Sequence, residues 1–469
     1  MDLRSLTITE AARLLHAKEV SAVELAQAHI DAIKNIEPGI HAFLEVFDDV
    51  LQQAKEADAR IALGTATTLT GIPIAVKDNI LIKGKISSGG SKILANYRAS
   101  YDAGVIEKLK SAQAVLIGRT NMDEFALGSS TENSAYGPTK NPHDVSRVPG
   151  GTSGGSAAAV AAHMVLGALG SDTGGSIRQP AAFSGVVGIK PTYGSVSRYG
   201  LIAAASSLDQ IGTLAKNVTD AETLFNAITG QDMRDSTSVS QNAYPPVSSK
   251  KRIGIPRDFL SAGVDADIRA QFDATLIRLI AQGYEVVDIS LPTFAHALAA
   301  YYIINPAEVS SNLSRFDGIR YGFSVEAEDI RKVYEQSRGQ GFGREARRRI
   351  LVGAFVLSSG YVDAYYRKAQ AVREAMRAEL AQVFDAVDYI VTPTTPTPAF
   401  KLGEKEDPLA MYAGDIFTVP VNLTGVPAIS VPSGNVVRDS VSLPVGFQAI
   451  ARHGGEASLF ALGRDIERN

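Results

Sequence analysis

Two segments of the sequence combine glycine with the hydroxyl side chains of serine and threonine. The first segment is Pro149-Gly150-Gly151-Thr152-Ser153-Gly154-Gly155-Ser156, and the second is Gly170-Ser171-Asp172-Thr173-Gly174-Gly175-Ser176-Ile177-Arg178. Hydroxyls can act as nucleophiles, and glycine-rich backbone can expose the main-chain N–H groups that an oxyanion hole requires. The segments therefore fit a serine-nucleophile active site, or alternatively a phosphate-binding or purely structural glycine loop.

Ser176 is the candidate nucleophile. The apolar run 165–169 directly precedes the second segment and predicts a buried strand. Ser176 would then lie on a tight loop at the edge of a sheet, where open α/β sheets commonly place their active groups. No histidine lies in or beside this segment, so a base must come from elsewhere in the chain.

Lys77 is the candidate base. It ends the apolar run 72–76, so we expect it where a buried strand meets a loop. Burial lowers the pKa of a lysine because it penalises the ammonium form, and a neutral amine can accept a proton from a hydroxyl. The alternative is an ordinary lysine whose ammonium reaches solvent while its stem lies along apolar surface.

The composition excludes several other kinds of chemistry. The 469 residues include no cysteine, which rules out disulfides, thiolate zinc sites, iron–sulfur clusters and cysteine nucleophiles. A net charge of -4 and a pI near 6.0 provide no basic surface for nucleic acid. We see neither a signal sequence nor an apolar run long enough to span a bilayer. We expect a cytoplasmic protein that makes no contact with a membrane.

The elements around the two segments predict an α/β fold. Residues 71–212 hold 21 of the 42 glycines, a density typical of backbone that turns sharply or approaches another group closely. Buried strands and helices alternate here, which favours a mixed, mostly parallel sheet covered by helices on both faces. The predicted strands are 72–76, 114–117, 165–169 and 186–189, and the predicted helices are 105–110 and 157–164.

The remaining chain adds helices to this core. Ser21-Ala22-Val23-Glu24 is a capping-box pattern that begins a helix, and Pro38-Gly39 is expected to end it. A strand at 389–391 runs into the proline-rich loop 392–398, which can be neither helix nor central strand. We expect a single domain, 1–469, with an N-terminal helical segment at 1–60, a glycine- and serine-rich core at 71–213 and a mostly helical insertion at 300–385.

These residues together resemble the amidase-signature family. Lys77, the segment from Gly150 and the segment from Gly170 occur in the order and at the spacing of that family. The resemblance covers nearly the whole chain and implies the amidase-signature fold. Within the family, further stretches are similar to the glutamine-hydrolysing A subunits of tRNA-dependent amidotransferases. These stretches are 120–125, 129–134, 314–322, 357–361 and 415–422.

The family implies a triad of serine, cis-serine and lysine. By position, Ser176 would be the nucleophile and Lys77 the final base, and the bridging cis-serine falls on Thr152. Threonine keeps the hydroxyl that relays a proton but adds a methyl group. We favour Thr152 as the bridge because its hydroxyl has a similar position and acidity; the alternative is that Ser153 shares the relay.

The same resemblance implies how the substrate would be held. Tyr301, Arg349 and Asp415 would hold glutamine, since arginine suits an α-carboxylate and aspartate suits an α-ammonium group. Taken alone, the run Arg347-Arg348-Arg349 also fits a solvated helix face. The oxyanion would be received by backbone N–H groups of Thr173, Gly174, Gly175 and Ser176.

The implied activity is glutamine hydrolysis through an acyl-enzyme, which supplies ammonia for converting Glu-tRNA(Gln) to Gln-tRNA(Gln), or Asp-tRNA(Asn) to Asn-tRNA(Asn). The chain itself would hold no cofactor and no metal. Of its partners, the B subunit would bind tRNA, use ATP and Mg²⁺ and receive the ammonia, and a small C subunit would fasten the two. The chain shows no Walker A loop and no G-x-G-x-x-G motif, in agreement with this division.

Two alternatives remain open. A free-standing amidase would share the triad but would not need Arg349 and Asp415 as a pair for a free amino acid. An inactive scaffold subunit is the other alternative, suggested by threonine at position 152.

Overall fold

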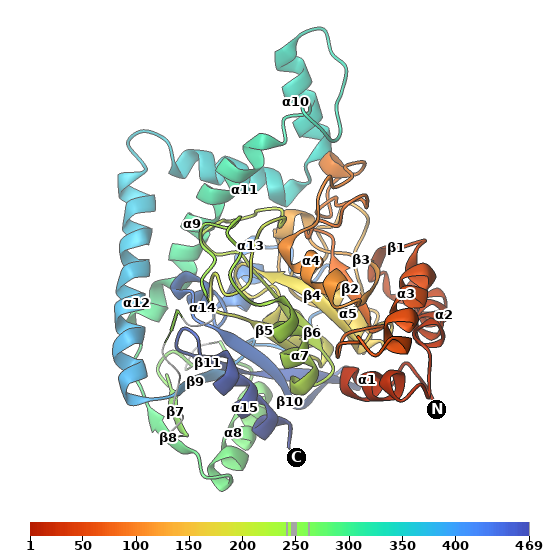
Figure 1. The fold of residues 1–469 in the computed structure, drawn as a ribbon. Coiled ribbons are helices and arrows are strands. Elements are labelled where there is room, and N and C mark those ends of the chain that lie inside the picture. Colours follow the sequence, from red (N-terminus) through yellow and green to blue (C-terminus); the bar gives the residue numbers. More distant parts are fainter. Residues whose placement is uncertain (241–242, 245–250, 261–262, 469) are drawn as a thin grey trace.

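One eleven-stranded sheet organises the molecule (Figure 1). The computed structural model describes residues 1–240, 243–244, 251–260 and 263–468. The strand order is β1-β3-β2-β4-β6-β5-β10-β11-β9-β7-β8. The strands are β1 (Phe43–Val46), β2 (Pro73–Lys77), β3 (Val115–Thr120), β4 (Gly167–Asp172), β5 (Val187–Lys190), β6 (Gln210–Ala215), β7 (Arg252–Ile255), β8 (Glu285–Asp288), β9 (Tyr389–Pro393), β10 (Ala428–Arg438) and β11 (Val441–Ala451).

Helices connect and flank these strands. The α-helices are α1 (Ile8–His16), α2 (Ala22–Ile40), α3 (Val50–Ala62), α4 (Gly104–Ser111), α5 (Gly154–Ala161), α6 (Arg178–Ser184), α7 (Val218–Ile228), α8 (Ala266–Ala281), α9 (Ala297–Asn312), α10 (Ile330–Gly341), α11 (Arg344–Val356), α12 (Lys368–Ala386), α13 (Pro408–Tyr412), α14 (Val419–Thr424) and α15 (Glu456–Glu467). The 3₁₀ helices are η1 (Lys92–Leu94), η2 (Glu124–Ala126), η3 (Pro292–His296), η4 (Leu313–Arg315) and η6 (Ala413–Asp415), and η5 (Asp363–Arg367) is a π-helical turn. Among the described residues, every helix is too short or too polar to span a bilayer.

The sheet is mixed, as predicted, but the expectation that it is mostly parallel is wrong. The parallel pairs are β2 with β3, β2 with β4, β7 with β8 and β7 with β9. The other six neighbouring pairs in the described sheet are antiparallel. A short connection forces this in the longest hairpin: only Asp439 and Ser440, both with positive φ, separate β10 from β11, so the second strand must run back along the first.

Helices cover both faces of the sheet, as predicted. Alternate residues of a strand point to opposite faces, and in β9 Ile390 and Val391 belong to two different apolar clusters. The cluster with Ile390 includes Ile304 of α9 and Met376 of α12. The cluster with Val391 includes residues of α8 and α15.

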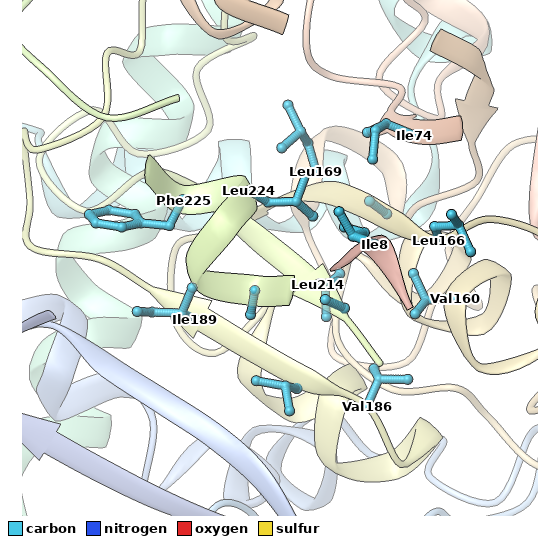
Figure 2. Packing of buried hydrophobic residues seen from close by; sticks show 14 of the residues in the cluster. Ile8, Ile74, Val160, Leu166, Leu169, Val186, Ile189, Leu214, Leu224 and Phe225 are labelled. Carbon is cyan, nitrogen blue, oxygen red and sulfur yellow. The ribbon is translucent and has the colours of Figure 1, made fainter. Parts of the chain in front are cut away.

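The sheet's larger apolar cluster surrounds β4, the strand that leads into the second glycine-rich segment. Figure 2 shows Leu169 of β4 and Leu214 of β6 together with Ile8 of α1 and Leu224 of α7. All four side chains are fully buried. Burial of a leucine or isoleucine side chain contributes about 1.5–3 kcal/mol relative to exposure, so these contacts fix the position of β4 and of the loop that follows it.

Two predicted boundaries differ from the structure for local reasons. Ser21 caps α2 through a capping box, as predicted, but the helix continues past Pro38 to Ile40. It ends where His41 adopts a left-handed conformation, and the Glu37 carboxylate accepts the N–H groups of Ala42 and Phe43. Likewise β9 extends to Pro393, which is tolerated because β9 no longer pairs with β7 at that point.

Candidate active site

Lys77 lies at the end of β2, fully buried with 0% of its surface exposed. Its Nζ lies 2.7 Å from Thr152 Oγ1, 2.8 Å from Ser153 Oγ and 2.9 Å from Ser171 Oγ. Burial lowers the pKa of Lys77 to about 7, although the negative charges of Asp123, Asp172 and Asp209 oppose this shift. A substantial fraction of the lysine is therefore a neutral amine at physiological pH, and the alternative of a solvent-exposed ammonium is wrong.

The first glycine-rich segment places Thr152 and Ser153 in contact with Lys77. Gly150 and Gly151 both have positive φ, at 83° and 44°, and a Cβ on Gly151 would lie 2.2 Å from Pro180 Cδ. Glycine is therefore required for this turn. The cis peptide bond implied by the family resemblance is absent, since all described peptide bonds are trans. The two left-handed glycines already turn the chain so that the Thr152 hydroxyl reaches the amine.

Thr152 and Ser153 differ in how their hydroxyls are engaged. Ser153 Oγ donates to the carbonyl oxygen of Ser171 (3.0 Å) and lies 3.3 Å from the Ser171 N–H, in addition to its contact with Lys77. Within the described chain, Lys77 is the one hydrogen-bond partner of Thr152 Oγ1. The Thr152 hydroxyl is thus free to accept a proton from another group while giving its own to the amine.

The second glycine-rich segment forms the turn between β4 and α6 and carries Ser176. The Asp172 carboxylate holds this turn by accepting the N–H groups of Gly175 (2.8 Å) and Ile177 (3.1 Å). The Ser153 N–H donates to the Ser176 carbonyl oxygen at 3.1 Å, which ties the two segments together. Ser176 is 7% exposed, and its hydroxyl has no hydrogen-bond partner among the described residues. Such a hydroxyl is available to attack a substrate.

The backbone of this turn supplies candidate oxyanion donors. The Gly175 N–H already donates to Asp172 Oδ1 at 2.8 Å, so it is the least available of the four predicted donors. The N–H groups of Gly174 and Ser176 have no acceptor within the described residues. These groups, with the neighbouring N–H of Thr173, remain the candidates for receiving an oxyanion.

Arg178 braces the same turn from a fully buried position. Its guanidinium binds both carboxylate oxygens of Asp172 at 3.0 Å. Burial alone would raise the pKa of Asp172, but the charge and hydrogen bonds of Arg178 hold that pKa well below its usual range. Asp172 therefore stays ionised and continues to accept hydrogen bonds from the N–H groups of the turn.

Tyr301 of α9 packs directly on the nucleophile loop. A Cβ on Gly174 would lie 2.5 Å from the Tyr301 hydroxyl oxygen, so glycine is needed for this close approach. Thr418 fixes the other side of the loop, because its Oγ1 donates to the Gly174 carbonyl oxygen at 2.6 Å. The predicted substrate residue Tyr301 is thus beside the predicted oxyanion donors.

Arg349 of α11 is buried, whereas its neighbours Arg347 and Arg348 are exposed and partly exposed. Its Nε donates to Glu345 Oε1 and its Nη1 donates to Asn305 Oδ1, each at 2.8 Å. Nη2 has no partner in the described part of the chain. The guanidinium carbon also lies 5.0 Å from the centre of the Tyr302 ring. Arg349 is therefore held with one N–H₂ group available for an anion.

Asp415 is linked to Arg349 through Tyr302. Its carboxylate accepts the hydroxyls of Ser129 and Tyr302, each at 2.8 Å to Oδ2. Burial raises the pKa of Asp415 to about 6, against the effect of these hydrogen bonds. Tyr302 therefore contacts both predicted glutamine-holding charges, through its hydroxyl and through its ring.

Sequence reasoning missed several residues of this site. Ser171 and Asn79 contact each other at 2.9 Å, and Ser171 also contacts the lysine amine. Ser129, Tyr302 and Asn305 support Asp415 and Arg349. Ser171 and Ser129 belong to quoted motifs, but Tyr302 and Asn305 are marked only by lying one and four residues after Tyr301. Among the described residues, no cluster of three or more His, Asp or Glu side chains is arranged to hold a metal.

Comparison with known proteins agrees with this arrangement. Residues 24–460 match the family model described as Amidase. The chain is 50% identical to the A subunit of glutamyl-tRNA(Gln) amidotransferase from Desulfosudis oleivorans, covering 100% of this chain and 98% of that protein. It is also 50% identical to the A subunit of the Coxiella burnetii enzyme, covering 97% of this chain and 95% of that protein.

Solved structures show the same fold. The A subunit of glutamyl-tRNA(Gln) amidotransferase from Thermotoga maritima has a TM-score of 0.82 at 42% identity, covering 100% of this chain and 96% of that one. The native peptide amidase of Stenotrophomonas maltophilia has a TM-score of 0.82 at 28% identity, covering 99% and 96%. Fold, motifs and sequence agree over nearly the whole length, and the chain belongs to the amidase family.

Proposed function

We propose that this chain is the glutamine-hydrolysing A subunit of a glutamyl-tRNA(Gln) amidotransferase. One observation carries the proposal: a buried amine with a pKa of about 7 lies against the Thr152 hydroxyl, next to the loop of Ser176. The amidotransferase subunits that share half of its sequence support the choice of glutamine.

In the proposed mechanism, Ser176 Oγ attacks the side-chain amide carbon of glutamine. Its proton passes to Thr152 Oγ1, whose own proton passes to the neutral amine of Lys77. The oxyanion is received by free N–H groups of the 173–176 turn; losing one such donor typically costs about 10²–10³ in rate. The C–N bond breaks as the relay returns a proton to nitrogen. Ammonia leaves, and water hydrolyses the ester to release glutamate.

Charged side chains away from Ser176 would hold the α-carboxylate and α-ammonium groups of glutamine. The free Nη2 group of Arg349 suits the α-carboxylate, and Asp415, ionised above about pH 6, suits the α-ammonium group. Tyr301 lies between these charges and the nucleophile loop. Such a pair of opposite charges favours a free amino acid over the simple amides of a free-standing amidase.

The proposal divides the work among three proteins. The B subunit would bind the misacylated tRNA, use ATP and Mg²⁺ and receive the ammonia, and a small C subunit would fasten the other two. This chain would hold no cofactor of its own. Because aminoacyl-tRNA is used where protein is made, the proposal places the chain in the cytoplasm.

Strands from the whole chain share one sheet, so we propose one domain with 1–60, 71–213 and 300–385 as its parts.

Glutamine hydrolysis by the purified chain, with and without tRNA and the co-expressed B and C subunits, tests the proposal. We expect low activity alone and a marked rise with the partners. High activity alone on unrelated small amides would instead support a free-standing amidase. A γ-glutamyl electrophile should label Ser176 covalently, as read by mass spectrometry, and a chain that fails to label would be an inactive scaffold.

A further inference from the structure

A cluster of apolar side chains packs the loop after β3 against the helices between residues 300 and 385. The ring of Phe125 stacks on Phe316, with ring centres 5.0 Å apart, and lies 5.7 Å from Phe342. Ile93 belongs to the same cluster. Glu124 stands directly beside Phe125 and is only 2% exposed. A carboxylate in such surroundings requires hydrogen-bond partners to offset its lost hydration.

Glu124 finds these partners at the start of α11. Its Oε2 accepts the backbone N–H of Gly343, the residue that precedes the helix, at 2.8 Å, and its Oε1 accepts the Ser91 hydroxyl at 2.5 Å. The Ser91 hydroxyl also lies 3.3 Å from the carbonyl oxygen of Gly341. A Cβ at position 343 would lie 2.5 Å from Oε2, so glycine permits this approach. A carboxylate at a helix N-terminus is also stabilised by the helix dipole.

Helix α11 carries Arg349 six residues beyond Gly343, a rise of about 9 Å along the helix. Glu345 and Asn305 set the orientation of the arginine side chain. The position of the helix itself decides whether the free Nη2 group can meet a substrate. Glu124 therefore links the motif loop after β3 to the backbone that carries Arg349.

We propose that Glu124 is a positioning residue for glutamine: its carboxylate fixes the N-terminus of α11 and so places Arg349 against the α-carboxylate of the substrate. Glu124 acts through the helix and does not touch the reacting atoms. This inference rests on the proposed function.

The test measures glutamine hydrolysis by the complete amidotransferase containing Glu124→Ala or Glu124→Gln. Glu124→Ala should raise the KM for glutamine roughly tenfold with kcat little changed, because the hydrogen bond to the Gly343 N–H is lost away from the reacting atoms. Glu124→Gln should restore most of the affinity, since its amide oxygen can still accept the Gly343 N–H. Ser91→Ala, which removes the support of Oε1, should raise KM in the same direction and serves if Glu124→Ala fails to fold.

Asp220 supplies the matched control. It is a buried carboxylate that accepts the N–H groups of Ile8 (2.8 Å) and Thr9 (3.2 Å) at the start of α1, across the molecule from α11 in Figure 1. Asp220→Ala should lower the melting temperature and leave the KM for glutamine unchanged. Unchanged KM in both Glu124→Ala and Ser91→Ala, or equal changes of KM in Asp220→Ala, would overturn the inference. Absence of glutamine hydrolysis in the wild-type complex would overturn the proposed function instead.

Discussion

Lys77 is surrounded by oxygen atoms of hydroxyl groups and of one carbonyl, at 2.7–3.3 Å from its nitrogen. In the described part of the chain, no ion pair holds its ammonium. The carboxylates of Asp123, Asp172 and Asp209 act only through space, so burial dominates and the pKa falls. A neutral amine has one lone pair, which can accept the hydroxyl proton of Thr152. The surroundings of Lys77 therefore favour its neutral form, which can act as a base.

Glutamine hydrolysis should depend on the charge of Lys77. Because only the neutral amine accepts a proton, the rate should fall about tenfold per pH unit below the pKa of about 7 and level off above it. Lys77→Met should reduce kcat by about 10²–10⁴-fold on the plateau above pH 7, and by a smaller factor at lower pH, where the wild-type lysine is itself protonated. Steady-state rates between pH 5.5 and 9 measure both effects. A variant that retained wild-type rates would remove Lys77 from the mechanism.

The same pKa predicts a stability effect of defined sign. The folded pKa of about 7 lies below the ordinary lysine value of 10.5. Between these values the unfolded chain binds more protons, so the contribution of Lys77 makes the free energy of unfolding rise with pH. Lys77→Met should abolish that contribution and be at least as stable as wild type at pH 7. Urea denaturation at pH 7 and pH 9.5 checks the sign.

Substitutions at positions 152 and 153 should have different effects. Thr152→Ala removes the proton relay and should lower kcat by about 10²-fold or more, whereas Thr152→Ser should stay close to wild type. Ser153→Ala removes bonds to Ser171 and should lower the melting temperature. It should reduce kcat much less than Thr152→Ala does. If Ser153→Ala instead lowers kcat as strongly as Thr152→Ala, both hydroxyls relay the proton.

The turn between β4 and α6 is held by charges rather than by regular secondary structure. Asp172 at the end of the strand accepts N–H groups of the turn, and Arg178 at the start of the helix neutralises its charge. Both side chains are completely buried. A buried pair costs desolvation, and removing one partner leaves an uncompensated charge. The geometry of the nucleophile loop therefore depends on both residues.

Asp172→Asn should destabilise the protein by about 3–5 kcal/mol, because Arg178 would remain buried without a counter-charge. It should also lower activity by loosening the Ser176 loop. Urea denaturation gives the free energy of unfolding. Glu335→Gln, which breaks the exposed ion pair with Arg331 on α10, should change it by less than about 1 kcal/mol. Equal effects of the two substitutions would contradict this account.

Local patterns predicted those elements whose causes are local. The apolar run before Lys77 and the capping box of α2 both appear at the expected places. Pairing direction was predicted wrongly, since antiparallel pairs such as β4 with β6 depend on how distant strands meet. The contacts of Tyr302 with Asp415, 113 residues apart, likewise depend on tertiary packing. The engagement of the Gly175 N–H by Asp172 requires the detailed shape of the turn.

At the scale of the whole molecule, the site draws on segments from most of the chain. Lys77 comes from β2, Ser176 from the turn after β4, Arg349 from α11 and Asp415 from η6. Residues 330–341 form α10, which projects away from the sheet in Figure 1. The sheet thus acts as a frame on which distant segments meet.

Glutamine hydrolysis by this chain should be insensitive to thiol reagents. The sequence contains no cysteine, so iodoacetamide has no thiol to alkylate, in contrast to an enzyme with a cysteine nucleophile. The assay compares rates before and after treatment at pH 7, with a cysteine-dependent glutaminase as a positive control. Inactivation here would show that the activity comes from a contaminating enzyme or from a partner protein.

The hydrogen bonds of Arg178 also determine when the active site can form during synthesis of the chain. Besides Asp172, its guanidinium binds the Thr418 carbonyl oxygen, Asn422 and Gln448. A chain emerging from the ribosome has its lysine and nucleophile long before Gln448 is made. Until that late segment arrives, the buried cation lacks part of its coordination and the Ser176 turn lacks its support. Nascent chains should therefore be unable to release free ammonia before Gln448 has been made and has reached Arg178.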